Sequence, residues 1–190
     1  MYIQSMKTIL KITKNELSTL FYSPIAWLIL IIFTFQSGMA YAEAWADALR
    51  SQALGYTVYG ATERLLLGWS GAISSMQEHL YLYIPLLTMG LMSQEYNRGS
   101  IKLLYSSPVT NKQIIFGKYL SMIIYALILV AILFIYYAFT AFTIKAIDTP
   151  FVMTALLGIF LMICAYAAIG LFMSSLTSYQ VVAAVGTLAI

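Results

Sequence analysis

The chain is predicted to fold as an all-α bundle of membrane-spanning helices, and three observations point to that class. It is 62% hydrophobic and only 9% charged, unlike the mixed usage of soluble domains. Uncharged apolar runs recur at separate places along the 190 residues, and they approach the roughly 20 residues that a helix needs to cross a bilayer core. A soluble domain of this length has too small an interior to bury all of these runs.

Residues 1–23 are predicted to form an amphipathic helix that lies on the membrane surface. On a wheel of 3.6 residues per turn, the apolar arc holds Met6, Ile9, Leu10, Leu17, Leu20 and Phe21. The polar arc holds Lys7, Lys11, Lys14, Asn15 and Ser18. Only Ile12 departs from this division. The lysines favour anionic head groups, and the segment lacks the cleavage pattern of a signal peptide.

Residues 24–190 are predicted to be the transmembrane region. Its expected spans are residues 25–42, 72–93, 119–142 and 151–173, and Pro150 is placed to open the last of these. Trp27 and Tyr41 stand near the two ends of the first span, where amphipathic rings favour the membrane interfaces. A fifth run, 181–190, would rise only about 15 Å, half of a bilayer core. We therefore expect a truncated chain with about four and a half spans.

The distribution of basic residues predicts the orientation in the membrane. Three lysines precede the first span, and the loop after the second span carries four basic residues: Arg98, Lys102, Lys112 and Lys118. The other two connections together hold only three basic residues: Arg50, Arg64 and Lys145. Acidic residues partly offset the charge of these three. This excess places the amino terminus and the loop around residue 100 in the cytoplasm.

Motifs for catalysis and nucleotide binding are absent from the sequence. It has no Walker A, GxGxxG, HExxH or CxxC pattern, and its one cysteine, Cys164, lies inside a span. Residues 119–143 and 151–190 contain no charged residue and no histidine, although ion-coupled transporters commonly place such residues near the midplane. We therefore predict that the chain is not an enzyme, holds no cofactor or metal, and draws the energy for any transport from another subunit.

Glu78 and His79 are the ionisable residues of the second predicted span. If that span reaches the inner face near Ser93, the pair lies about 21 Å above that face, within the hydrocarbon layer. Two interpretations are open. The pair lines an exit path or forms a pH-sensitive gate, or, more ordinarily, both side chains snorkel to the outer head groups.

Two pairs of small residues stand four apart on a helix face, Gly38 with Ala42 and Gly170 with Ser174. This spacing permits close contact between helices. Packing within the chain is the more ordinary explanation, and a subunit interface is the alternative.

Residues 94–116 are predicted to form a helix, a break and a second helix on the cytoplasmic side. The second spanning helix continues into this segment past Gly99 to Lys102, and Pro108 ends or turns it. Thr110 restarts a helix, because Thr110 and Gln113 have the spacing of a capping box.

The stretch 84–121 resembles the signature of ABC-2 type transporter permeases. That signature runs from Pro-Leu-Leu-Thr-Met to an acid, then Arg-x-Gly-Thr/Ser, a Leu-Leu pair, Ser/Thr-x-Pro and Gly-Lys. The matching residues are Pro85 to Met89, Glu95, Arg98, Gly99, Ser100, Leu103, Leu104, Ser106, Pro108, Gly117 and Lys118. Gly170 to Val185 is similar to the loop between the family's fourth and fifth spans. Lys102 departs from the pattern, since relatives more often carry an acid there.

The resemblance implies a six-span subunit with a fold like that of type V ABC exporters. Such a subunit dimerises, with itself or with a relative, and pairs with two separate ATP-binding subunits. Residues 1–23 would be its elbow helix and residues 94–116 its coupling segment, which transmits nucleotide-driven motion. The implied residues of the ATPase interface are Glu95, Arg98, Gly99, Ser100, Lys102, Leu103, Leu104 and Pro108. Within the family, the likeness is nearest to gliding-motility and nitrous oxide reductase maturation permeases.

We therefore expect a permease subunit of an ATP-driven exporter, surrounded by lipids in the bacterial inner membrane and without a nucleic-acid partner. A membrane anchor or assembly subunit of a motility or maturation complex would be expected to have a loop with the same features. It therefore stays open as an alternative. A secondary transporter whose charged residues lie elsewhere is the other alternative. No side-chain pattern specifies the substrate.

Overall fold

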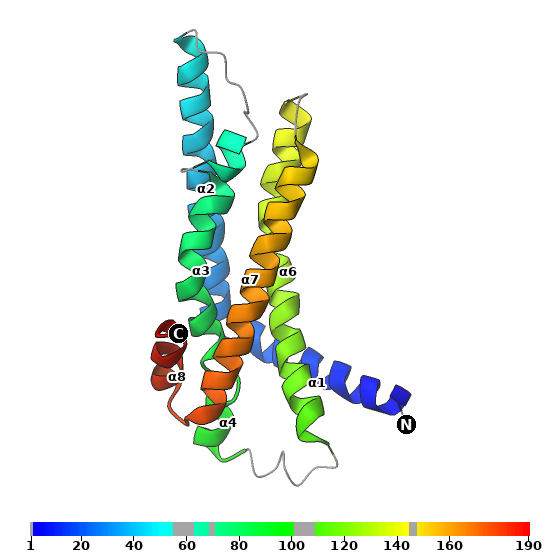
Figure 1. The fold of residues 1–190 in the computed structure, drawn as a ribbon. Helices are drawn as coiled ribbons and strands as arrows, with labels where there is room; N and C mark the ends of the chain where they lie inside the picture. The colour runs from blue at the N-terminus through cyan, green and yellow to red at the C-terminus, as the bar shows by residue number, and fades with distance from the viewer. Residues whose placement is uncertain (1, 55–62, 69–70, 101–108, 145–147) are drawn as a thin grey trace. The chain divides into compact units, whose positions relative to one another are not determined.

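The computed structural model describes residues 2–54, 63–68, 71–100, 109–144 and 148–190, and within them every regular element is a helix (Figure 1). The elements are α1 (Tyr2–Tyr22), α2 (Pro24–Ala53), the π-helix η1 (Glu63–Leu67), α3 (Ala72–Thr88), α4 (Ser93–Arg98), α6 (Asn111–Thr143), α7 (Thr149–Leu176) and α8 (Gln180–Leu188). The predicted all-α class is confirmed.

Three helices of the described part are long and apolar enough to cross a membrane: α2, α6 and α7. Large apolar side chains on them remain exposed, including Phe35 at 66% and Ile135 at 64%. Exposure on this scale is a liability in water but is ordinary where lipid covers the helix. These helices make the chain a membrane protein.

The second predicted span, residues 72–93, is interrupted in the structure. α3 contains Pro85 and ends at Thr88, the next four residues form turns, and α4 begins at Ser93. Pro85 has no amide hydrogen, so it removes one donor from the hydrogen-bond ladder of α3. The first predicted span, residues 25–42, instead continues as helix beyond its apolar run, to Ala53.

The chain divides into two compact units. Unit 1 comprises Met1–Leu28, Tyr81–Ala126 and Ile163–Ile190, so it holds α1, α4, α8 and the adjoining ends of the longer helices. Within it α8 lies beside α4 (Figure 1). Tyr125 of α6 is fully buried there, and its hydroxyl donates to the Ala26 carbonyl at 2.8 Å. This bond joins the start of α2 to α6 within unit 1.

Unit 2 comprises Ile29–Leu80 and Leu127–Met162. In this unit α2 packs on α6 through hydroxyl groups: the Tyr41 and Thr140 oxygens are 2.6 Å apart, and Ser37 Oγ donates to Tyr136 Oη at 3.3 Å. A Cβ atom added to Gly38 would lie 3.3 Å from Tyr136 Oη. Gly38 of the first small-residue pair therefore packs within the chain.

Candidate functional site

A close helix contact at Gly117 anchors α1 to the first turns of α6. A Cβ atom at Gly117 would lie 2.6 Å from Ile12 Cγ2 and 2.8 Å from Ile12 Cβ, so a larger residue does not fit without displacement. The hydroxyl of buried Thr13 lies 2.9 Å from the Ile9 carbonyl oxygen and 3.1 Å from that of Gly117. Ile12, which departs from the predicted amphipathic pattern, is thus explained by its packing on α6.

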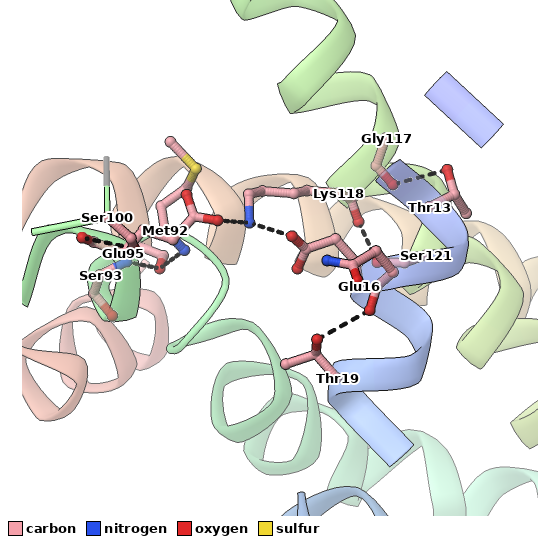
Figure 2. A network of polar contacts seen from close by, with 12 residues as sticks. Thr13, Glu16, Thr19, Met92, Ser93, Glu95, Ser100, Gly117, Lys118 and Ser121 are labelled. Carbon is pink, nitrogen blue, oxygen red and sulfur yellow. Dashed lines mark hydrogen bonds and ion pairs between the residues drawn. The ribbon is translucent and has the colours of Figure 1, made fainter. Parts of the chain in front are cut away.

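A buried ion triad joins three helices next to this contact (Figure 2). Lys118 Nζ of α6 lies 2.7 Å from Glu16 Oε1 of α1 and 2.8 Å from Glu95 Oε1 of α4. Lys118 is only 1% exposed, and Figure 2 shows the two carboxylates on either side of its ammonium group. An ammonium group at such depth requires compensating charge. The triad therefore ties α4 both to α6 and to α1.

The charges of the ion triad do not balance, because two carboxylates share one ammonium. Burial raises the pKa of Glu16 above its ordinary value; the charge and hydrogen bond of Lys118 oppose this rise, and the Glu95 carboxylate adds to it. Glu95 Oε2 is buried and has no hydrogen-bond partner among the described residues. Both carboxylates and Arg98 line a polar cavity of about 180 Å³. One negative charge in the triad is thus left uncompensated by Lys118.

Ser174 of α7 closes the break between α3 and α4. Its Oγ accepts from the backbone amides of Met92 at 3.0 Å and Ser93 at 3.1 Å, and it donates to the Met89 carbonyl at 2.9 Å. Ser174 is fully buried. One side chain thus supplies the partners that the interrupted helix ladder does not, which is how backbone away from water keeps its polar groups satisfied.

Gly170 lies one turn before Ser174 and also packs on the break. A Cβ atom at Gly170 would lie 2.1 Å from Thr88 Oγ1 and 2.7 Å from Thr88 Cβ. The small-residue pair Gly170 and Ser174 therefore serves packing within the chain, in agreement with the more ordinary of the two explanations. Together they seat the end of α3 and the start of α4 against α7.

The carboxyl end of α4 is set by Gly99. This residue has φ of +71°, the left-handed conformation that ends many helices, and its amide donates to the Tyr96 carbonyl at 3.2 Å. The expectation that this helix continues past Gly99 is therefore wrong. Ser100 Oγ lies 3.4 Å from the Glu95 carbonyl oxygen, to which it donates. The predicted interface residues Lys102, Leu103, Leu104 and Pro108 lie outside the described residues.

The predicted start of a helix after Thr110 is confirmed. The Thr110 amide donates to Gln113 Oε1 at 3.0 Å, and the Gln113 amide donates to Thr110 Oγ1 at 3.4 Å. These reciprocal bonds are those of a capping box, and α6 begins with Asn111 directly after Thr110.

Glu78 and His79 lie on α3, in unit 2. Glu78 is exposed, and His79 is half-buried with its Nδ1 2.6 Å from the Ser75 carbonyl oxygen. Neither residue lines the polar cavity of the ion triad. Within the described residues, no group of three His, Cys, Asp or Glu side chains is placed to hold a metal ion.

Two members of the ion triad were missed as site residues in the sequence. The sequence places Lys118 among the basic residues of the loop and in the Gly-Lys match, and it assigns no role to Glu16. A signal for Glu16 does exist, since it is the only acid in the first 42 residues. It also shares the spacing of Ile9, Ile12 and Thr13, which place one helix face against α6. The missing information was which helix that face would meet.

The comparison with known proteins identifies the family. The family described as "ABC-2 family transporter protein" matches residues 10–190. The chain belongs to the ABC-2 transporter family. This membership supports a permease, the membrane-spanning subunit of an ABC transporter. The likeness to gliding-motility and nitrous oxide reductase maturation permeases stays a prediction.

A short stretch of the permease is also similar to a Bacillus subtilis (strain 168) protein named "Uncharacterized protein YhcI". The two are 37% identical over 54 residues, which is 28% of this chain and 17% of that protein. No solved structure matches the permease.

Proposed function

We propose that the permease is the membrane-spanning subunit of an ATP-driven exporter of the bacterial inner membrane. Its amino terminus and α4 face the cytoplasm, which the excess of basic residues on that side supports. It works with an ATP-binding subunit and with a second permease protomer, identical or related. Lipid surrounds the exposed apolar faces of its spans and the apolar face of α1.

The observation that carries the proposal is that α4 is held to two spanning helices at once. Ser174 bonds its first residue, Ser93, to α7, and Lys118 bonds Glu95 to α6. Glu16 extends the second connection to α1. A displacement of the six-residue α4 therefore acts on α7 through Ser174 and on α6 through the partners that Lys118 keeps or loses, because buried polar contacts have discrete partners and do not deform continuously.

In the proposed cycle, ATP binding closes the partner ATPases, which push on the coupling segment, residues 94–116. The spans of facing protomers then rock to open a path or to extrude a lipid-like substrate. Hydrolysis takes place in the partner, so the permease performs no chemistry. The contact residues include Glu95, Arg98, Gly99 and Ser100 of the described part.

Two substitutions test the coupling role. Glu95→Lys places a second cation against Lys118, and Gly99→Trp puts a bulky side chain at a positive φ. Both should abolish the ATPase stimulation that the permease confers on the ATPase that co-purifies with it in lipid, while membrane insertion stays normal. Glu43→Lys, the same charge change at an exposed site on α2, is the control. Wild-type stimulation in either variant refutes the coupling role.

The same assay separates the exporter from an anchoring subunit. An anchor holds the ATPase at the membrane without changing its rate, so the ATPase would then hydrolyse ATP equally fast with and without the wild-type permease. An exporter predicts a rate that depends on the permease and on Glu95.

A further inference from the structure

The two carboxylates that share Lys118 are attached to unit 1 very differently. Glu16 stands on the 21-residue α1, whose contact with α6 is reinforced by Ile12 and Thr13 at Gly117. Glu95 stands on α4, which has only six residues. The turns after Thr88 precede α4, and Gly99 ends it. The connection of Lys118 to Glu16 is therefore the fixed one, and the connection to Glu95 belongs to the more easily displaced helix.

The charges of the ion triad make the Glu95 connection the one that opens at low cost. Removing one partner of a buried ion pair ordinarily leaves the other charge buried without compensation. Here, if Glu95 withdraws, Lys118 keeps Glu16 at 2.7 Å and remains compensated. Withdrawal also relieves the excess negative charge that adds to the raised pKa of Glu16. Glu95 Oε2 already has no hydrogen-bond partner among the described residues, so Glu95 gives up only one bonded oxygen.

Arg98 does not replace Lys118 in this arrangement. It lines the same polar cavity, but among the described residues the ion pairs of Glu16 and Glu95 are made with Lys118. Arg98 also stands on α4 itself, so it moves together with Glu95 and cannot hold that helix to α6.

We propose that Lys118 is the positioning residue of the coupling step: it keeps its ion pair with Glu16 while it releases and recaptures Glu95, so that α4 separates from α1 and α6 and returns in each cycle. The transport cycle in this statement rests on the proposed function, whereas the exchange of Glu95 is a property of unit 1 alone. In both positions of α4 the buried ammonium has a carboxylate partner.

The experiment measures the distance between α1 and α4 with spin labels. Ser18→Cys and Asn97→Cys place labels at exposed positions in a Cys164→Ser background, and unlabelled permease dilutes the labelled copies so that distances within one copy dominate. The permease is studied in lipid together with the ATPase that co-purifies with it, with and without ATP. Glu43→Gln, the same change at an exposed site, is the matched control.

The two glutamates should respond in opposite ways although both changes only remove a charge. In Glu95→Gln the exchanging partner is weakened, so the distance distribution broadens toward longer values even without ATP. In Glu16→Gln, release would strand Lys118, so the distribution stays narrow with and without ATP, and ATPase stimulation falls at least tenfold. The wild type and Glu43→Gln should shift with ATP. Equal responses of Glu16→Gln and Glu95→Gln overturn the exchange.

The outcomes for the exchange and for the proposed function are separate. If the two glutamine variants differ as expected without ATP while Glu95→Lys keeps wild-type stimulation, the coupling role is refuted and the exchange stands. If Glu95→Lys abolishes stimulation while the two glutamine variants give the same distances, the exchange is refuted and the coupling role stands.

Discussion

Ser174→Ala removes a single hydroxyl group, but it is predicted to destabilise the permease by more than the loss of one hydrogen bond. The hydroxyl contacts three backbone groups, at 3.0, 3.1 and 2.9 Å, in a fully buried position. The Met89 carbonyl keeps a second donor, the Ser93 hydroxyl, so the substitution orphans two amides, those of Met92 and Ser93. Each buried group left unsatisfied costs about 1–3 kcal/mol, so for two amides we expect a loss of about 2–6 kcal/mol in the free energy of unfolding.

The assay is equilibrium unfolding of the permease in mixed micelles, followed by the loss of helical signal. Ser175→Ala is the matched control, because Ser175 is next in sequence and its hydroxyl makes one exposed bond, to the Phe172 carbonyl. That variant should lose about 0.5 kcal/mol or less. Ser174→Cys keeps the shape with a weaker acceptor and should fall between the two.

The magnitude decides between two explanations of the break. An ordinary hydrogen bond between membrane helices contributes about 0.6 kcal/mol on average to stability, because the same polar groups also form hydrogen bonds when the chain is unfolded in the membrane. Loss of only that amount in Ser174→Ala, similar to Ser175→Ala, would show that the amides at the break find other acceptors, and the account of Ser174 as its closing partner would then be wrong.

Three further predictions concern α1, the ion triad and the orientation. Gly117→Val should overlap Ile12 and cost about 1–3 kcal/mol of stability, and adding Ile12→Ala should recover part of it; no recovery would contradict the contact. Because burial raises the pKa of Glu16 above 4.5, its contribution to stability is full below that pH and is lost as the pH rises through the folded pKa. Glu16→Gln should remove this slope from the thermal midpoint measured against pH, and an unchanged slope would assign it to other groups. Asn97→Cys in a Cys164→Ser background should react with an impermeant maleimide in inside-out vesicles only, and labelling in intact cells would reverse the proposed orientation.

The elements of the fold were predictable wherever one local pattern decides the outcome. Long uncharged runs led to α6 and α7, and the Thr110 and Gln113 spacing led to the capping box that precedes α6. The interruption of the second span was not predicted. Pro85 weakens α3 locally, but the turns that follow are stabilised by Ser174, which lies more than 80 positions away in the sequence. A helix break that depends on a distant hydroxyl leaves no local periodicity to read.

The sequence by itself determined the class of protein and the membrane as its surroundings, and it predicts a coupling element around residue 95. Apolar composition and motif spacing are properties of residues close together in the sequence, so they can be recognised without knowledge of the fold. The tertiary structure alone decided that Glu16, Glu95 and Lys118 meet. Their charges were visible in the sequence, but their pairing depends on α1 approaching α6 closely at Gly117, and burial then turns three ordinary ionisable residues into an interdependent group.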